Sequence, residues 1–176
     1  EVFPLGETIV TWTATDSSGN SSSDSQKITL IDSAPPEIIT TDEIFEANIS
    51  SGTNASLDLP IISDIQDVTL TNDAPEVFPL GETIVTWTAT DVMGNIILTK
   101  QTISVVDTTA PVIEAPSDFR IEASHTENNV IELVGVRVSD QVEVSSITND
   151  APASFPLGET IVTWTATDSS GNSCLI

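Results

Sequence analysis

A fourteen-residue segment, FPLGETIVTWTATD, occurs three times without a change in this sequence, at Phe3–Asp16, Phe78–Asp91 and Phe155–Asp168. The starts of the three copies are 75 and 77 residues apart. Shorter matches keep the same spacing, because TNDAP occurs at 71–75 and again at 148–152. Helical solenoid units repeat every ~33–47 residues, so the longer period of this chain fits a small β domain that is repeated as a whole.

Two aspartates, Asp32 and Asp107, open proline-containing segments at matching positions of the repeat. We interpret these segments as linkers between domains. The predicted organisation is the C-terminal part of a first repeat at 1–31, a complete repeat at 32–106, and a third repeat at 107–176 that lacks its last strand. A sandwich of about 75 residues has a small core. Packing against a neighbouring repeat, a bound metal or assembly with other chains would stabilise it.

The repeated segment has the period-2 pattern of a half-buried strand. In the complete repeat, Val85, Trp87 and Ala89 fall on one face, and threonines occupy the other. We therefore expect each of the three tryptophans, Trp12, Trp87 and Trp164, to be the large core residue of its own repeat.

Turn signals surround this strand. Residues 79–81 predict a glycine turn, and 91–95 predict a hairpin into a last strand at 96–106, with Ile103 and Val105 pointing inward. No segment shows a sustained 3.6-residue apolar period. Some seven short strands per repeat predict an all-β fold of tandem immunoglobulin-like Greek-key β-sandwiches of about 75 residues. The first half of the complete repeat contributes predicted strands at 37–41, 44–48, 57–62 and 68–71.

The run FPLGETIVTWTATD followed by Ser-Ser-Gly-Asn, preceded by TNDAP and closed by D-x-x-x-P, resembles the hyalin repeat, or HYR domain. The resemblance covers essentially the whole chain, as part of one copy, one full copy and most of another. It implies an immunoglobulin-like fold in extracellular proteins, used for adhesion, cell-surface architecture or spacing. Many family members carry a cysteine pair. Here Cys174 stands alone, and it is either incidental or a partner for a cysteine outside this sequence.

The chain is strongly acidic, with 4 Lys and Arg against 27 Asp and Glu and a formal net charge of −23. Such a charge repels nucleic acids and anionic lipids, so nucleic-acid binding is excluded. It also opposes the compact state through self-repulsion, which cations would relieve. No apolar stretch approaches the 18 or so residues of a membrane span, and we expect no membrane insertion in this segment.

Residue types that carry catalysis are scarce. The single histidine, His125, lies in a polar stretch, and neither a G-x-S-x-G motif nor a Cys–His pair accompanies it. Carboxylates could form a glycosidase pair, but they repeat with the domain, and catalytic sites are rarely copied in every unit of an array. We therefore expect that this chain is not an enzyme.

Calcium is the one cofactor that the sequence leaves open, because it takes about six to eight oxygen ligands, mostly carboxylates and carbonyls, although no D-x-D-x-D-G loop occurs and the aspartates are scattered. Two candidates, Asp32 and Asp107, lie at the linkers, and the others lie in loops. For Asp91 and Asp168 the alternative role is turn formation, in which the side chain accepts hydrogen bonds from nearby backbone N–H groups. The candidate ligands are Asp32, Asp107, Asp64, Asp67, Asp91, Asp140, Glu143 and Asp168.

Three N-x-S sequons, at Asn20, Asn48 and Asn54, are candidate glycosylation sites. A sequon is an acceptor only in a secreted protein. Chance matches are common in a sequence rich in Asn and Ser, so the sequons alone do not decide between a modified and a bare surface.

The leading functional hypothesis is a structural or adhesive repeat segment of an extracellular or cell-surface protein, forming a rod, surface layer or filament. Its partners would be neighbouring repeats and other copies of the chain, joined by strand addition at unpaired sheet edges. The alternatives are a ligand-binding adhesin, whose loops hold a glycan or a surface protein, and an accessory module of a larger secreted enzyme. Near-identical copies favour the structural hypothesis, because every unit then performs the same task.

Overall fold

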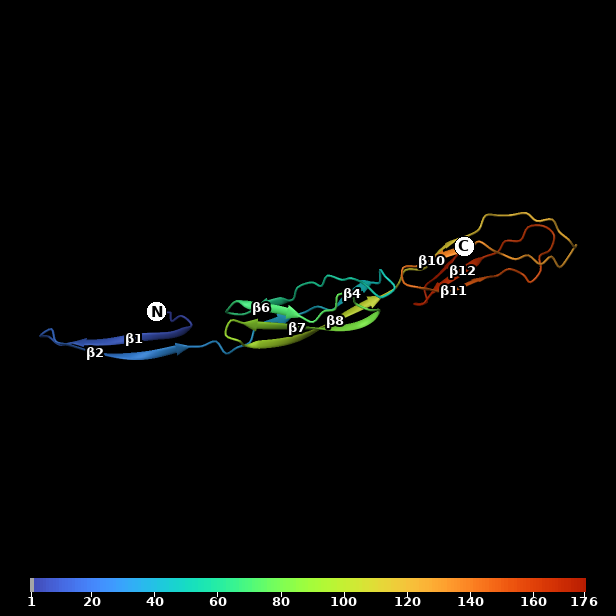
Figure 1. Cartoon of the computed structure of the whole chain (residues 1–176). Coiled ribbons are helices and arrows are strands. Elements are labelled where there is room, and N and C mark those ends of the chain that lie inside the picture. Colours follow the sequence, from blue (N-terminus) through green and yellow to red (C-terminus); the bar gives the residue numbers. More distant parts are fainter. Residues whose placement is uncertain (1) are drawn as a thin grey trace. The chain divides into compact units, whose positions relative to one another are not determined.

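The computed structural model describes residues 2–176, and its regular structure consists of β-strands. Within that range there is no helix, so none could cross a membrane. The all-β prediction is confirmed. The strands (Figure 1) are β1 (Gly6–Thr15), β2 (Ser21–Leu30), β3 (Glu37–Ile39), β4 (Glu43–Glu46), β5 (Ile61–Ser63), β6 (Val68–Asn72), β7 (Gly81–Asp91), β8 (Ile96–Val106), β9 (Val112–Glu114), β10 (Arg137–Ser139), β11 (Val144–Asn149), β12 (Trp164–Asp168) and β13 (Ser173–Leu175).

Strands β1 and β2 form a two-stranded antiparallel hairpin, drawn in blue in Figure 1. The prediction that Trp12 is a core residue is wrong, because its side chain is 65% exposed. The physical reason is that a sheet of two strands offers Trp12 only the strand beside it, where Asp24 is its partner in the register. Isolated hairpins of this kind bury little apolar surface.

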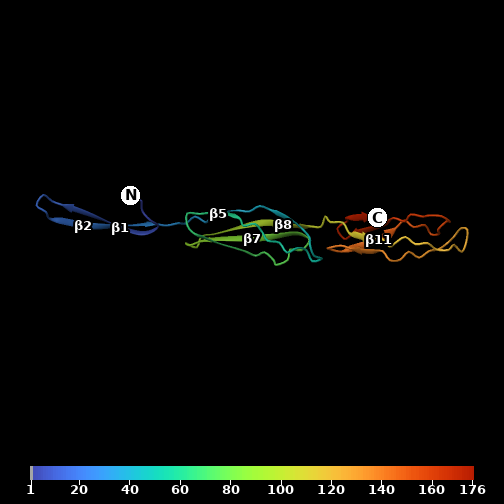
Figure 2. The ribbon, with the colours of Figure 1, turned by 90° about the horizontal axis from the view of Figure 1, so that it is seen from above.

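The central repeat has two sheets. Strand β3 pairs antiparallel with β5, and a four-stranded sheet has the order β4-β8-β7-β6. In that sheet β4 runs parallel to β8, and β6 runs antiparallel to β7. Strands β7 and β8 lie side by side in both views (Figure 1 and Figure 2). Because the consecutive strands β3 and β4 join different sheets, the arrangement fits the predicted immunoglobulin-like sandwich.

Six strands, β3 to β8, form this repeat, rather than the seven or so predicted. All four strands predicted for its first half are present, with shifted bounds. Between β4 and β5 the chain makes only isolated bridges, Ile49 with Gly52 and Thr53 with Phe78. Gly52 has φ +130°, and a Cβ at this position would lie 1.9 Å from the carbonyl oxygen of Phe78. This close approach fits only glycine.

The predicted alternation of β7 is confirmed. Val85 and Ala89 are fully buried and Trp87 is 2% exposed, whereas the threonines between them are half-buried. On β8, Ile103 and Val105 are buried, as the sequence predicts. Each large apolar side chain contributes roughly 1.5–3 kcal/mol by leaving water, so these positions dominate the stability of the repeat.

The third repeat contains the pair β9–β10 and a three-stranded sheet of order β11-β12-β13. Its core consists of Ile113, Trp164 and Ala166, and the half-buried Cys174 packs against them. Strand β12 begins only at Trp164, although the same sequence in β7 begins at Gly81. The reason is that β13 is only three residues long, and a strand persists where a neighbour takes up its backbone hydrogen bonds.

The backbone groups into two compact units. The first comprises the chain up to Ile39 together with Pro60–Asn72 and Trp87–Thr99. The second comprises Thr40–Leu59, Asp73–Thr86 and Lys100–Ile176. The repeat-based division at 31/32 and 106/107 stays a prediction.

Trp87 and Trp12 occupy the same position of the repeated segment, so they form a matched pair for mutation. We expect Trp87→Ala to lower the free energy of unfolding by about 3–5 kcal/mol, because it empties a buried site. Trp12→Ala should change it by no more than about 0.5 kcal/mol, because Trp12 is exposed. Urea denaturation followed by circular dichroism measures both. Equal losses in the two variants would contradict this account of the core.

Candidate metal centre

A five-residue pattern, D-x-x-G-N, closes the same turn in each copy. In the central repeat Asp91 Oδ1 accepts hydrogen bonds from the backbone N–H groups of Met93 and Asn95, both at 2.8 Å. Asp91 Oδ2 accepts a third from Asn95 Nδ2 at 2.7 Å. The same three bonds recur around Asp168 and Asp16. Turn formation, the alternative role considered for Asp91 and Asp168, is therefore observed.

These bonds favour the ionised form of two buried carboxyl groups. Asp91 is 5% exposed and Asp168 is 2% exposed. Burial is the largest influence on the pKa of Asp91 and raises it, because burial disfavours the charged form. The hydrogen bonds from Asn95, Met93 and Gly94 together outweigh burial and lower the pKa below its ordinary value. The pKa of Asp168 is lowered by the corresponding balance.

In the central and third repeats, the asparagine of the turn also holds the linker. Asn95 Nδ2 donates to the backbone carbonyl oxygen of Asp32 at 3.4 Å. Asn172 Nδ2 donates to that of Asp107 at 3.0 Å. Sequence reasoning missed this role of the asparagines. The signal that could have revealed it is the conservation of D-x-x-G-N among the three copies within this chain, Asp16 to Asn20 included.

Three aspartates converge at the same place in each of two repeats. One oxygen of each aspartate lies within 4.8 Å of an oxygen of the other two. Each triad lies wholly inside one compact unit. The structure thus brings together six of the eight candidate ligands. The first triad is Asp32, Asp64 and Asp91, and the second triad is Asp107, Asp140 and Asp168.

The remaining two candidates lie outside the triads. Asp67 and Glu143 follow Asp64 and Asp140 by three residues, and their side chains are exposed. The backbone carbonyl of Glu143, rather than its carboxylate, accepts a hydrogen bond from the N–H of Ser169 at 3.0 Å.

The linker aspartates of the two triads differ in their hydrogen bonds. Asp32 Oδ1 accepts one from the N–H of Ala34 at 3.1 Å, whereas Oδ2 is buried and accepts none. Asp107 Oδ2 accepts a hydrogen bond from Ser170 Oγ at 2.8 Å. The position of Ser170 is occupied by Met93 in the central repeat, and a thioether has no proton to donate.

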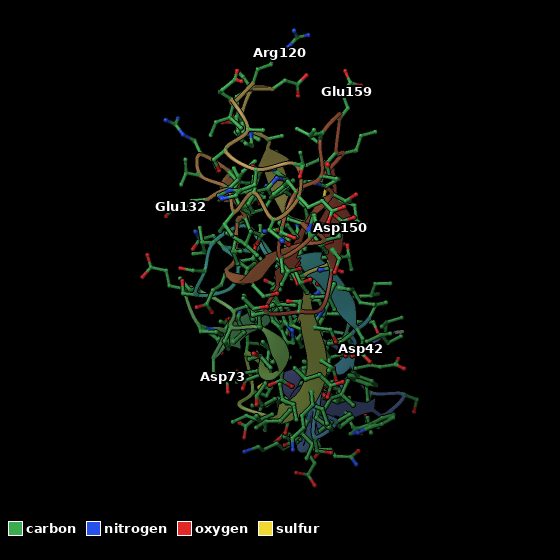
Figure 3. All side chains as sticks on the ribbon, turned by 90° about the vertical axis from the view of Figure 1, so that its right-hand side faces the viewer. Asp42, Asp73, Arg120, Glu132, Asp150 and Glu159 are labelled. Atoms are coloured by element: carbon green, nitrogen blue, oxygen red, sulfur yellow. The ribbon has the colours of Figure 1, made fainter. Side chains whose placement is uncertain are left out.

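No basic side chain offsets the charge of either triad. Within residues 2–176 the one ion pair joins Lys27 and Glu7, which lie outside both triads. Other acidic side chains, such as those of Glu132 and Glu159, extend away from the ribbon (Figure 3). Carboxylates this close repel one another unless a cation or a proton intervenes. Carboxylate oxygens are hard ligands, which suit calcium or magnesium.

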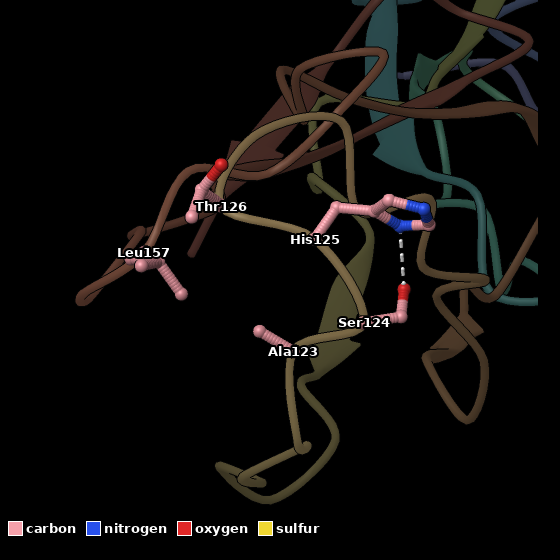
Figure 4. A pocket seen from close by; sticks show the side chains of 5 residues that line it. All are labelled: Ala123, Ser124, His125, Thr126 and Leu157. Carbon is pink, nitrogen blue, oxygen red and sulfur yellow. Dashed lines mark hydrogen bonds between the residues drawn. The ribbon is translucent and has the colours of Figure 1, made fainter.

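The only histidine is not part of these clusters. His125 lies in an exposed loop, as the sequence predicts, and its Nδ1 is hydrogen-bonded to Ser124 Oγ at 2.9 Å (Figure 4). With Ala123, Thr126 and Leu157 these residues line a pocket. None of the lining residues is an acid that could orient the imidazole as in a Ser-His-Asp triad.

The asparagines of the three sequons are exposed at Asn20, Asn48 and Asn54. Asn20 Nδ2 donates to Asp16 Oδ2 at 2.9 Å, so a glycan on this nitrogen would compete with the turn. Glycosylation stays a prediction at all three positions.

Comparison with known proteins gives a consistent result. Residues 106–174 match the HYR domain. The chain is 35% identical to hyalin from Lytechinus variegatus, over 98% of this chain and 36% of that protein. It is 30% identical to hyalin from Strongylocentrotus purpuratus, over 98% of this chain and 16% of that protein. The chain therefore spans about a third or less of the length of these relatives.

Two further matches add less: one covers about half of this chain, and the other has low sequence identity and a low TM-score. The Sushi, von Willebrand factor type A, EGF and pentraxin domain-containing protein 1 of Rattus norvegicus is 39% identical over 99 residues. This alignment covers 53% of this chain and 3% of that protein. Extracellular cadherin domains 1–4 of protocadherin gamma B7 superpose with a TM-score of 0.36 and 16% identity, over 97% of this chain and 56% of that one. A TM-score this low carries no argument about the fold.

The turn at Asp91 makes stability depend on pH. Because the folded pKa of Asp91 lies below the ordinary value of 3.8, its ionised form stabilises the fold above that value, and this contribution is lost as the pH falls through the folded pKa. We expect Asp91→Asn to melt below the wild type at neutral pH, with a difference in melting temperature that narrows as the pH falls below the ordinary pKa of 3.8.

Thermal melts followed by circular dichroism measure this gap. Asp67→Asn removes an exposed acid outside the triads and is the matched control, which should keep the wild-type profile. A gap for Asp91→Asn that stays constant down to the lowest pH would show that the charge of Asp91 does not close the turn.

Proposed function

Since the chain belongs to the HYR domain family, we propose that it is a structural repeat segment of adhesion type in an extracellular protein, and that its repeats form a stiffened series. Family membership rests on the match of residues 106–174 and on relatives aligned along 98% of the chain. The proposal treats the chain as a spacer or a building unit of a surface layer or filament, and not as an enzyme.

One observation carries this proposal: the second linker is held from both sides. Glu46 ends β4 of the central repeat, and its carboxylate accepts hydrogen bonds from Thr108 N at 2.7 Å, Thr108 Oγ1 at 2.9 Å and Thr109 Oγ1 at 2.8 Å. Next to them, Asp107 is held by Asn172 of the third repeat. All of these residues belong to the same compact unit.

Hydrogen bonds to a carboxylate are stronger than those between neutral groups, so they order a segment that would otherwise be flexible. The pKa of Glu46 is lowered, first by the backbone N–H of Thr108 and then by the hydroxyl of Thr109, because these bonds favour the ionised carboxylate. Linkers ordered in this way transmit orientation from one repeat to the next. The length of such a series then grows with the number of repeats.

The structural proposal predicts that Glu46→Ala loosens the linker. Hydrogen exchange at the amide of Thr108 should become about tenfold faster or more, because the amide loses its carboxylate partner. Glu132→Ala removes an exposed acid of the third repeat and is the matched control, with unchanged exchange at Thr108. Unchanged exchange in Glu46→Ala would contradict the clamped linker.

The same proposal predicts the behaviour of longer arrays. Small-angle scattering on chains with increasing numbers of repeats should give a maximum dimension that grows in proportion to repeat number. Growth close to the square root of repeat number, as for flexibly jointed domains, would contradict a stiffened series.

A further inference from the structure

We propose that the outer face of the larger sheet in each repeat is an interface that pairs with the same face of a second copy of this chain. The larger sheet is β4-β8-β7-β6 in the central repeat and β11-β12-β13 in the third. The inference rests on the proposed structural role and deepens it, because it names the surface through which a layer or filament would assemble. A chain that stays monomeric could still have a clamped second linker, so the two proposals fail separately.

In the central repeat, the repeated segment presents threonines on the outer side of the sheet. Because Trp87 and Ala89 are buried in the core, the residues that alternate with them on β7 point outward. On the neighbouring strands, β6 contributes two threonines opposite those of β7, and β8 contributes two exposed apolar side chains. All of these residues belong to one compact unit. We call this set the central face, and it consists of Thr69, Thr71, Thr88, Thr90, Ile96 and Leu98.

The third repeat has an equivalent set, which we call the C-terminal face. Thr167 of β12 is the register partner of Ser146 on β11 and of Ser173 on β13. The hydroxyls of Thr167 and Ser173 are hydrogen-bonded at 2.9 Å, as are those of Thr13 and Ser23 in the first hairpin at 3.0 Å. The C-terminal face consists of Ser146, Thr148, Thr165, Thr167, Ser173 and Leu175.

The outward threonines of the repeated segment are the same in every copy, although core packing does not require them. The segment is unchanged in all three copies, whereas the strand after the turn begins with Ser-Ser-Ser in the first copy, Ile-Ile-Leu in the second and Ser-Cys-Leu in the third. Outward positions of a strand tolerate many residue types with little effect on stability. The recurrence of the same outward residues favours a surface that every repeat presents to the same kind of partner.

The absence of charge distinguishes the two faces from other parts of this acidic chain. The chain has 27 Asp and Glu, yet no residue of either face is charged. The outer side of the smaller sheet differs, because it carries Glu37 in the central repeat and the register partners Glu114 and Arg137 in the third. On the side of β7 and β8 that contains the central face, the charged residues are Glu82 and Lys100, whose charges have opposite signs. Depletion of charge is typical of the core of a protein interface.

Charge and composition favour a second copy as the partner. Two chains with a net charge of −23 repel each other, and the repulsion is weakest where the contact itself contains no acid. Hydroxyls both donate and accept hydrogen bonds, so the faces are complementary to themselves, as a two-fold contact requires. The exposed Leu98 and Leu175 add apolar surface that pairing would bury. A neutral polysaccharide fits less well, because sugar rings stack on aromatic side chains, and Trp87 and Trp164 are buried.

Each face is small, so single repeats should pair weakly. A standard interface has roughly 20–30 residues on each side, which is far more than either face provides. Repeats linked in one chain raise the effective concentration of the next contact, so pairing becomes stronger with the number of repeats. This dependence suits the building unit of a layer or filament.

Sedimentation equilibrium of the full chain, at concentrations up to about 1 mM, tests the interface. We expect reversible dimerisation that becomes stronger between about 0.05 M and about 0.5 M salt, because salt screens the repulsion between acidic chains. A double variant, Leu98→Asp with Leu175→Asp, should raise the dissociation constant more than about tenfold, since two-fold pairing brings the introduced charges together.

The matched control is a second double variant, Ile61→Asp with Val112→Asp, on the smaller sheets. These side chains are 70% and 62% exposed, against 61% for Leu98 and 66% for Leu175, so both double variants place the same charge on exposed strand positions. The control should dimerise as the wild type does, and circular dichroism checks that both variants fold.

Three results would overturn the proposal. The first is a wild-type chain that stays monomeric at every salt concentration. The second is a dimer that the face variant leaves intact or that the control weakens as much, which would assign pairing to strand edges or to the smaller sheets. The third is a monomer that is retained on insoluble chitin and loses this retention in the face variant, which would assign the faces to a polysaccharide.

Discussion

The hydrogen bonds between an aspartate and the asparagine four residues later organise the start of the central and third repeats. The carboxylate of Asp91 closes its own turn, and the amide of Asn95 passes the constraint on to the linker carbonyl of Asp32. This places a buried carboxylate beside the first residue of the repeat. The turn alone does not bury the acid, because Asp16 closes the same turn and stays exposed; Asp91 and Asp168 are buried where the other strands of their repeats are present.

Three identical segments show what a sequence decides and what it does not. The alternation of β7, its buried Trp87 and the turn that follows could all be predicted, because they depend on side-chain period and on local turn chemistry. The length of this strand in each copy could not be predicted from the sequence. The same residues form ten residues of strand in β1 but only Trp164–Asp168 in β12, since pairing depends on the neighbouring strand. Trp12 is exposed for the same reason.

The candidate ligands were found by their recurrence at linkers and loops, yet spacing alone could not separate members of a triad from their neighbours. Asp64 and Asp67 lie three residues apart in one loop, and only the tertiary fold decides which of them meets Asp91. The exchange of Ser170 for Met93 is a single loop difference in the sequence. It gains meaning only when Asp32 is seen to lack a donor.

Sequence identity between repeats also bears on how the array folds. A strand that is the same in adjacent repeats can pair in a neighbour's sheet as well as in its own, and such misassembly is a characteristic failure of repeat proteins. The D-x-x-G-N turn closes within five residues, so loop closure costs little and the hairpin can form before a second copy is within reach. We therefore expect fast hairpin closure to protect the array from strand exchange between its own near-identical copies.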